Sequence, residues 1–208
     1  MLLDALRKNL AEHQAEKVAG YDYPQAAVLL PITRSPEPRL LFTRRADHLN
    51  THSGQVAFPG GKRDPEDRDL IATALREAEE EIALIPDEVE IIGTLGELIS
   101  LHGIRVTPFV GLIPDNLALA PCEEELDAIF EVPVRWFFDD PRTHTDHIQV
   151  ADQELYVPSY LWQEYRIWGL SAMMLVELLQ VGFDQPVSLF DKPEGQLIQR
   201  PVRPFPPR

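Results

Sequence analysis

Four glutamates crowd one short stretch of the sequence. Glu77, Glu79, Glu80 and Glu81 fall within five positions, directly after Arg76. Like charges at helical spacing repel each other by about 0.2–0.5 kcal/mol per pair, so the crowding needs a reason. A solvated helix face is the usual explanation of a glutamate run. A bound cation is the other, because carboxylate oxygens are the ligands that hard divalent metals prefer.

Helical geometry divides these glutamates into two groups. At about 100° per residue, Glu77, Glu80 and Glu81 gather on one side of a helix predicted over 69–83, whereas Glu79 points elsewhere. A separate narrow stripe is expected to face the core, and it consists of Ile71, Leu75, Ala78 and Ile82. The helix therefore carries a core stripe and a carboxylate stripe. The latter has the donors to hold Mg²⁺ or Mn²⁺.

The segment before this helix favours the cation. A predicted strand over 55–62 is interrupted at Phe58-Pro59-Gly60-Gly61. Paired glycines let the backbone turn sharply and approach a ligand closely, and a carbonyl in such a turn can join helix carboxylates around a metal. A plain strand–loop–helix connection is the alternative. The combination with Arg-Glu-x-x-Glu-Glu indicates a metal site more strongly than either feature alone.

The stretch 61–84, GKRDPEDRDLIATALREAEEEIAL, resembles the Nudix box, G-x5-E-x7-R-E-U-x-E-E-x-G-U. The opening glycine is Gly61, and the R-E-U-x-E-E core is matched residue for residue by 76–81. Asp67 stands where the box has its first glutamate, and eight residues rather than seven then precede Arg76. Ala83 takes the place of the late glycine.

A second motif narrows the resemblance. The stretch 40–61, LLFTRRADHLNTHSGQVAFPGG, looks like the extended signature of coenzyme A pyrophosphatases. Arg45, Ala46, Gly54 and Phe58–Gly61 fall in register, whereas Asn50 replaces the second arginine of that signature. The segment EYRIWGLSAMMLVELL also resembles the closing helix of bacterial members. The departure at Asn50 removes a cation from the place where the substrate carries phosphates, which leaves substrate choice open.

This resemblance implies an α/β/α Nudix sandwich, with a mixed β-sheet between helices. It also implies hydrolysis of a nucleoside diphosphate linked to another group, with a divalent metal. For this branch the substrate is coenzyme A or a derivative, cleaved to 3′,5′-ADP and 4′-phosphopantetheine or its acylated form. The implied metal ligands are Glu77, Glu80, Glu81 and the carbonyl of Gly60 or Gly61. Arg76 is expected to pair with a neighbouring carboxylate and orient it.

Other candidate site residues lie outside the box. Glu125, in the acidic run 123–125, is the candidate for a general base or a further ligand, and a solvated loop is an equal alternative. The candidates for contacting substrate phosphates are Arg44, Arg45, Lys62 and Asn50. Arg44 and Arg45 are neighbours on a predicted strand, so at most one of them should face the site.

Apolar patterning supplies the elements that position these residues. Helices are predicted over 2–18, 69–83 and 164–182, and strands over 26–32, 39–45, 55–62, 89–95, 105–113 and 126–134. This mixed order indicates the α/β class with helices on both faces of a sheet. We expect a helical extension over 1–24, the Nudix domain over 25–190, and an extended or disordered proline-rich tail over 191–208. The last helix, with its apolar stripe from Trp168 to Leu178, is expected to pack on its own core, or alternatively in a homodimer.

Bulk composition limits the classes of partner. The 208 residues carry a net charge of -15, which argues against a general nucleic-acid or membrane-surface binder. Cys122 is the single cysteine, so no internal disulfide can form, and its acidic neighbours disfavour a thiolate nucleophile. The sequence shows no secretion signal and no membrane-spanning apolar run, and we expect a cytoplasmic protein.

Three alternatives to coenzyme A hydrolysis stay open. The first is the same chemistry on NADH, ADP-ribose or a dinucleotide. The second is a catalytically silent Nudix module that binds a nucleotide and regulates a partner. The third is an acidic structural protein, and thermal stabilisation by a metal would separate it from the others.

Overall fold

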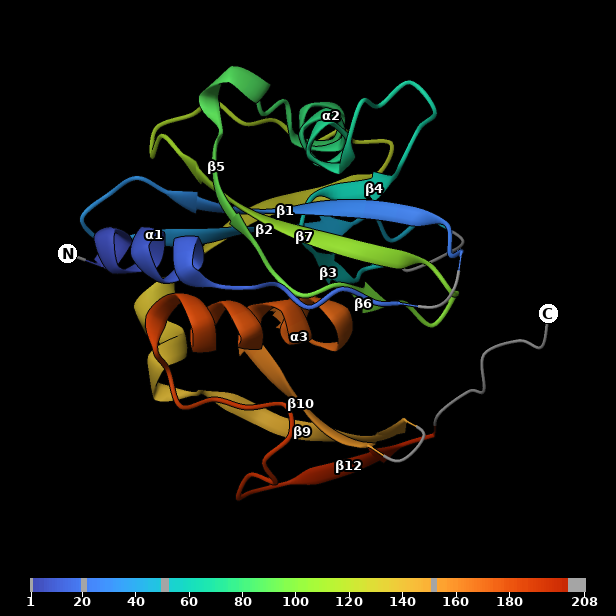
Figure 1. Cartoon of the computed structure of the whole chain (residues 1–208), viewed down its shortest axis with the longest axis vertical. Coiled ribbons are helices and arrows are strands. Elements are labelled where there is room, and N and C mark those ends of the chain that lie inside the picture. The colour runs from blue at the N-terminus through green and yellow to red at the C-terminus, as the bar shows by residue number, and fades with distance from the viewer. Residues whose placement is uncertain (1, 20–21, 50–52, 151–152, 202–208) are drawn as a thin grey trace.

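The computed structural model describes residues 2–19, 22–49, 53–150 and 153–201 (Figure 1). Its α-helices are α1 (Leu2–Glu12), α2 (Leu70–Ile82) and α3 (Gly169–Glu177). Its strands are β1 (Gln25–Thr33), β2 (Arg39–Arg45), β3 (Val56–Ala57), β4 (Gly60–Lys62), β5 (Glu90–Thr94), β6 (Leu98–Ile99), β7 (Arg105–Ile113), β8 (Leu126–Pro133), β9 (Arg142–Val150), β10 (Gln153–Trp162), β11 (Tyr165–Ile167) and β12 (Leu197–Arg200). Short 3₁₀ turns span Pro86–Glu88 and Val134–Asp139, and a π-helical turn spans Leu178–Gly182.

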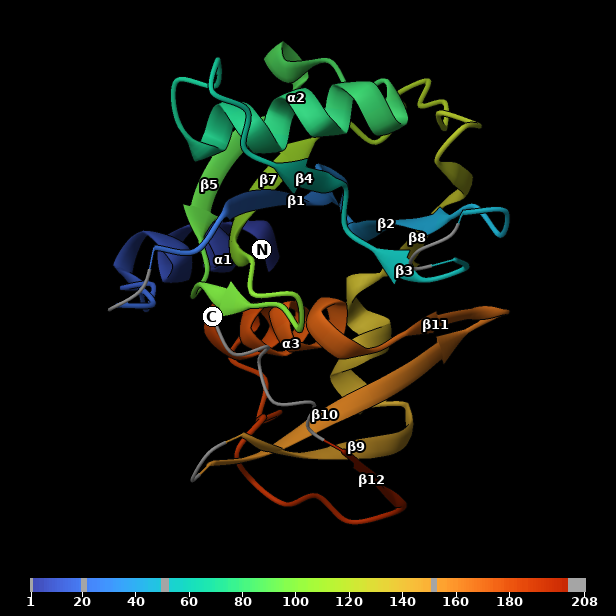
Figure 2. The ribbon, with the colours of Figure 1, turned by 90° about the vertical axis from the view of Figure 1, so that its right-hand side faces the viewer.

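The larger sheet positions the predicted site. Its central path is β3-β2-β1-β7-β5, with β4 paired to β1, β6 to β7 and β8 to β2. Strands β1 and β7 are parallel, and the other pairings in this sheet are antiparallel. Helix α2 covers one face, while α1 and α3 lie on the other (Figures 1 and 2). The predicted mixed sheet between helices is therefore confirmed.

Each face of this sheet has its own apolar cluster. Ala27, Leu29 and Leu41 turn toward α2, where they pack with Ala74 and other residues of the helix. The alternate residues of the same strands, such as Leu30 and Phe42, turn toward α1 and α3. This alternation is what a strand buried on both faces requires. The two clusters fix the height of α2 above the sheet.

A second sheet, in the order β11-β10-β9-β12, lies on the far side of α3 (Figure 2). It was not predicted from the sequence. Helix α3 therefore lies between two sheets, and Met174, Leu178 and Tyr160 belong to one shared core. The expected core role of the α3 stripe is confirmed for these methionine and leucine side chains, while Trp168 is 38% exposed. Packing of α3 in a homodimer stays a prediction.

The prediction of a helix over 164–182 was wrong at the start of that range. Tyr165–Ile167 forms β11, which pairs with Trp162–Tyr160 of β10 through a tight turn at Gln163, where φ is 54°. The apolar side chains read as a helical stripe are in part strand residues. In the C-terminal segment, residues 197–200 form β12, which pairs in parallel with β9.

The first helix is shorter than the predicted range 2–18 and ends at Glu12. The chain beyond it is held in a non-helical form by the β5–β6 loop. The Val18 N–H donates to the Glu97 carboxylate at 2.9 Å, and the Glu97 N–H donates to the Glu16 carbonyl at 2.9 Å. Among the described residues, none of the helices is long and apolar enough to span a membrane.

Candidate active site

Helix α2 is fixed at both ends. Asp69 caps its start by accepting a hydrogen bond from the Ala72 N–H at 2.8 Å. Ala83 ends it in the left-handed conformation with φ of 56°, where the signature has glycine. Ala74, Ala78 and Ile82 are fully buried against the sheet. Ile71 and Leu75, predicted for the core stripe, are only partly buried at its margin.

The two glycines before α2 permit a close approach of the backbone to the helix. Strand β4 pairs with β1 so that Gly60 lies opposite Val28 and Gly61 opposite Ala27. A Cβ on Gly60 would lie 2.4 Å from the Ala27 carbonyl oxygen, and φ at Gly60 is 154°. A Cβ on Gly61 would lie 2.4 Å from the Glu77 carboxylate. Any larger residue at either position would displace the strand or the carboxylate.

Glu81 is a buried carboxylate, and only 6% of the residue is exposed to solvent. One of its oxygens accepts a hydrogen bond from the Gly60 N–H at 3.1 Å. Burial raises the pKa of Glu81 to about 7, and the negative charges of Glu77 and Glu125 add to this shift. Arg45 acts in the opposite direction and lowers it.

Glu77 lies beside Glu81 and is half-buried. Burial raises its pKa, the Arg76 cation opposes that shift, and the charges of Glu80 and Glu125 add to it. The Arg76 guanidinium lies 3.1 Å from the Glu77 carboxylate. Glu77 and Glu81 thus act on each other electrostatically, and the charge of Glu125 acts on both.

Glu80 is placed differently from the other two helix glutamates. Its side chain is 60% exposed and accepts a hydrogen bond from Arg76 Nη1 at 3.1 Å. Within the described ranges, no three His, Cys, Asp or Glu side chains are arranged as a closed metal cage. The predicted ligand set is therefore not preassembled, and its membership stays a prediction.

Arg76 pairs with several carboxylates, as predicted, and the most buried of them is Asp67. Asp67 accepts hydrogen bonds from Arg76 Nε at 3.0 Å and Nη2 at 3.1 Å. The Thr73 hydroxyl and the Asp64 N–H donate to the same carboxylate at 2.8 and 2.9 Å. These donors, Arg76 first, hold the pKa of Asp67 far below its usual range despite the cost of burial. The shorter acid that replaces the expected glutamate thus anchors the loop to the helix.

The two adjacent arginines of β2 have different surroundings, and the expectation that at most one of them faces the site stays a prediction. Arg45 lies near Glu81, and its Nε is buried without a hydrogen-bond partner among the described residues. Arg44 instead donates to Asp127 and Asp47, both at 2.6 Å.

The remaining predicted residues surround this centre. Glu125 is exposed, and its carbonyl accepts from the Ala46 N–H at 2.8 Å. Lys62 is also exposed, and its carbonyl accepts from Arg76 at 3.1 Å. Asn50 lies outside the described residues.

Sequence reasoning missed the carboxylates that hold these arginines. Asp67 is a departure from the box that precedes the helix. Its two side-chain partners, Thr73 and Arg76, are three apart on one helix face, and this pair of donors was a usable signal for a nearby acid. Asp127 gave no local signal. It meets Arg44 from 83 positions away, through strand pairing that only the fold supplies.

The donor set fits a hard divalent cation. Two carboxylates, the buried Glu81 and the half-buried Glu77, lie beside the Gly60–Gly61 segment, which leaves no room for a Cβ, and burial raises the pKa of both. A cation held by Glu77 and Glu81 would offset the desolvation of these two groups.

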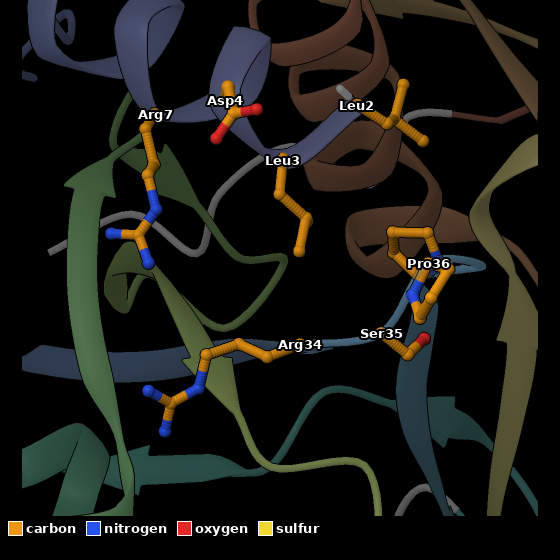
Figure 3. Close-up of a pocket in the computed structure, with 8 residues that line it drawn as sticks. Leu2, Leu3, Asp4, Arg7, Arg34, Ser35 and Pro36 are labelled. Atoms are coloured by element: carbon orange, nitrogen blue, oxygen red, sulfur yellow. The ribbon is translucent and has the colours of Figure 1, made fainter.

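A cavity also lies away from these residues, beyond the end of β1 at Thr33. It has a volume of about 330 Å³ and is lined by α1 and the segment after β1 (Figure 3). Leu3 points into it, and the guanidinium groups of Arg7 and Arg34 lie together on one side. Both arginines pair with Glu90, which Arg7 Nη2 contacts at 2.8 Å and Arg34 approaches at 3.9 Å. None of the glutamates predicted for the site is among the residues that line this cavity.

The mixed sheet between helices gives the α/β/α architecture predicted above, and carboxylates of α2 lie beside the two glycines of β4. The profile of the NUDIX domain family matches residues 23–153, and the chain belongs to this family. It is a Nudix hydrolase, an enzyme that cleaves the diphosphate bond of nucleoside diphosphate derivatives.

Two relatives at 47% identity support this membership. The chain is 47% identical over 158 residues to the uncharacterized Nudix hydrolase NudL of Yersinia pestis, covering 75% of this chain and 78% of the relative. The NudL protein of Yersinia pseudotuberculosis matches to the same extent. Among solved structures, the Nudix hydrolase RenU of M. smegmatis overlaps with a TM-score of 0.47 at 22% identity, covering 58% of this chain and 76% of that one.

Proposed function

We propose that this enzyme hydrolyses the diphosphate bond of coenzyme A or its derivatives. The products would be 3′,5′-ADP and 4′-phosphopantetheine, or its acylated form. The substrate class rests on the signature residues Arg45, Ala46, Gly54 and Phe58–Gly61 in their register. The observation that carries the chemistry is the pair Glu77 and Glu81, held against the Gly60–Gly61 segment with raised pKa values.

Each residue then has a role that follows from its surroundings. Glu77, Glu81 and a carbonyl of Gly60 or Gly61 would hold Mg²⁺ or Mn²⁺, with the exposed Glu80 as a further ligand. A divalent ion bound there would neutralise diphosphate charge and lower the pKa of a bound water. Arg76 orients Glu77 and Glu80 while Asp67 holds its guanidinium. Arg45, with its unpartnered Nε, would donate to a phosphate oxygen, and Lys62 would supply a second cation at the rim.

Glu125 is the proposed general base. It lies in the field of Glu77 and Glu81, and its exposed position gives it access to water. The water oxygen would attack one phosphorus, its proton would pass to Glu125, and the bridging P–O bond would break. The leaving phosphate departs with the electrons of that bond.

A second candidate function is the same hydrolysis of NADH, ADP-ribose or another nucleoside diphosphate derivative. Asn50 favours it, because an amide replaces the second signature arginine. A silent nucleotide-binding module is disfavoured. It would have no need to keep Glu81 buried at the cost that its raised pKa records.

Chromatography of reaction products tests this proposal. The pure protein is incubated with coenzyme A, NADH or ADP-ribose, with and without Mg²⁺ or Mn²⁺, beside Glu81→Gln. Metal-dependent 3′,5′-ADP from coenzyme A, reduced at least about 100-fold in the variant, would support the proposal. Cleavage of NADH or ADP-ribose alone would keep the chemistry and overturn the substrate. Absence of cleavage with any metal would favour the silent module.

A further inference from the structure

Arg44 joins two segments that approach the site from different parts of the chain. Its Nη1 donates to Asp127 Oδ2 at 2.6 Å and its Nη2 donates to Asp47 Oδ1 at 2.6 Å. Asp127 Oδ2 also accepts from the Asp47 N–H at 2.9 Å. One guanidinium therefore ties the end of β2 to the start of β8.

The ladder between these strands is irregular at this point. Arg44 lies opposite Ala128, but Arg45 lies opposite Leu126, so Asp127 has no partner in the register. Such a bulge shifts the following residues by one position and re-aims their side chains. Leu126 consequently faces α2 with Arg45, and Ala46 is brought opposite Glu125, whose carbonyl accepts its N–H at 2.8 Å.

The turn that carries Glu125 is also tied to α2. The Cys122 N–H donates to the Glu81 carbonyl at 2.8 Å, and the Glu125 N–H donates to the Cys122 carbonyl at 2.9 Å. The Leu126 N–H donates to the same Cys122 carbonyl at 2.8 Å. The start of the turn, at Cys122, is thus hydrogen-bonded to α2. Arg44 holds the other end of the turn through Asp127.

We propose that Arg44 is a positioning residue of the hydrolase, acting through the Asp127 bulge to hold the Glu125 carboxylate over Glu77 and Glu81. This inference rests on the proposed role of Glu125. It replaces the sequence-based expectation that Arg44 binds substrate, because both ends of its guanidinium are already occupied by carboxylates. The planar arginine guanidinium can bridge two carboxylates in a fixed geometry, whereas a lysine ammonium has no such fixed geometry.

The same two strands supply a matched control. Arg39 of β2 donates through Nε to Glu131 of β8 at 2.9 Å. Their side-chain exposures, 42% and 33%, resemble the 28% and 34% of Arg44 and Asp127. This pair also bridges β2 and β8, but it lies at the far end of the ladder from Glu125. Its loss measures what any ion pair on these strands contributes.

Steady-state kinetics on coenzyme A, or on ADP-ribose if only that is cleaved, tests the proposal with Arg44→Gln, Asp127→Asn and Arg39→Gln. We expect Arg44→Gln and Asp127→Asn each to lower kcat at least about tenfold with a smaller change in KM. Arg39→Gln should leave kcat within about twofold. An equally small effect of Arg44→Gln would overturn the proposal.

The double variant Glu125→Gln/Arg44→Gln separates positioning from a direct role. If Arg44 acts through Glu125, its loss should lower kcat less than about twofold once Glu125 is absent. A full additional loss would overturn the proposal, because Arg44 would then act on substrate by itself. Failure of Glu125→Gln to lower kcat would overturn it as well.

Hydrogen exchange gives a readout that does not need activity. Arg44→Gln should accelerate exchange of the Asp47 and Ala46 amides, which donate to Asp127 and Glu125, while Arg39→Gln should not. If the wild-type protein cleaves nothing, the proposed function fails, and this exchange pattern alone decides whether the bulge is held by Arg44. Unchanged exchange in Arg44→Gln would overturn the positioning role.

Discussion

Two acidic side chains at the predicted site are almost equally buried and have opposite pKa shifts. Asp67 is 8% exposed and Glu81 is 6% exposed. Asp67 accepts hydrogen bonds from Nε and Nη2 of Arg76, the Thr73 hydroxyl and the Asp64 N–H, and its pKa is lowered. Glu81 accepts one from the Gly60 N–H, and its pKa is raised to about 7.

Burial alone therefore does not decide what an acid does here. Asp67 has the donors that a buried charge needs, and it acts as an anchor of the loop before α2. Glu81 lacks them and is unstable as an anion until a cation arrives, which is the property of a binding site. The following predictions test this contrast, beginning with the largest expected effect.

Removing Asp67, the acid whose hydrogen bonds are all made, should lower the stability of the fold most. Asp67→Ala should lower the free energy of unfolding by roughly 2–4 kcal/mol, because it leaves the Arg76 guanidinium short of a partner. Urea denaturation at pH 7 without metal measures this loss. Asp64→Ala is the control, since Asp64 is 63% exposed and 3.9 Å from Arg76. It should cost less than about 0.5 kcal/mol.

The stability difference between the wild type and Asp67→Ala should depend on pH. Because the folded pKa of Asp67 is lowered, its contribution is complete above the unfolded pKa of about 4 and is lost as pH falls through the folded value. The difference between wild type and Asp67→Ala should therefore shrink below about pH 4. A constant difference down to pH 2 would assign the loss to packing instead of charge.

A divalent metal should stabilise the region of Glu81. At a concentration of about 100 times the Kd, Mg²⁺ or Mn²⁺ should add roughly 2.7 kcal/mol and raise Tm by several degrees. Glu81→Gln should abolish this shift, which differential scanning calorimetry measures. Glu79→Gln should keep it, because Glu79 is exposed on another side of the helix. An unchanged shift in Glu81→Gln would remove Glu81 from the ligand set.

Neutralising Glu81 should stabilise the metal-free protein. Its raised folded pKa means that the folded state binds more protons than the unfolded state between about pH 4.5 and 7, so stability falls with rising pH in this window. At pH 8, Glu81→Gln should gain roughly 1–3 kcal/mol, and the gain should vanish below about pH 4.5. Urea titrations at these two pH values check it. A loss of stability at pH 8 would mean that the Glu81 carboxylate has donors not identified above.

The smallest expected effect concerns backbone strain at Ala83, the residue that ends helix α2. Ala83 adopts φ of 56°, which glycine adopts without penalty. Ala83→Gly should therefore stabilise the protein by roughly 0.5–1 kcal/mol, measured by the shift in urea midpoint. Ala72→Gly, inside the same helix, should instead destabilise it by about 1 kcal/mol. Equal effects of the two substitutions would argue against strain at Ala83.

The sequence was sufficient where local rules decide the structure. Helix α2 was expected over 69–83 and spans Leu70–Ile82, because one helical period orders both its apolar and its acidic residues. The break in the strand before this helix was predictable from Pro59, but Gly60 and Gly61, expected to turn, lie in strand β4 instead. The positions of Glu77 and Glu81 beside it followed from spacing along the chain.

Other features depend on contacts between distant segments and could not be predicted. The strand β9, with the sequence RTHTDHIQV, has no clean apolar alternation, and its pairing with β10 and β12 is visible only in the fold. Tyr165–Ile167 gave a helical pattern, but pairing with β10 prevailed over it. Glu80 was grouped with the ligands by azimuth, whereas its contact with Arg76 turns it to the surface.

The position of α3 between two sheets has a consequence for where the folding unit ends. The family profile stops at residue 153, before α3 begins at Gly169. Leu175 and Ala172 of α3 share one core with Phe42 of β2 and Val157 of β10. A fragment cut at the profile boundary would therefore leave an apolar face of the catalytic sheet open to water and prone to aggregation. The family profile therefore covers less of the chain than the packed core does.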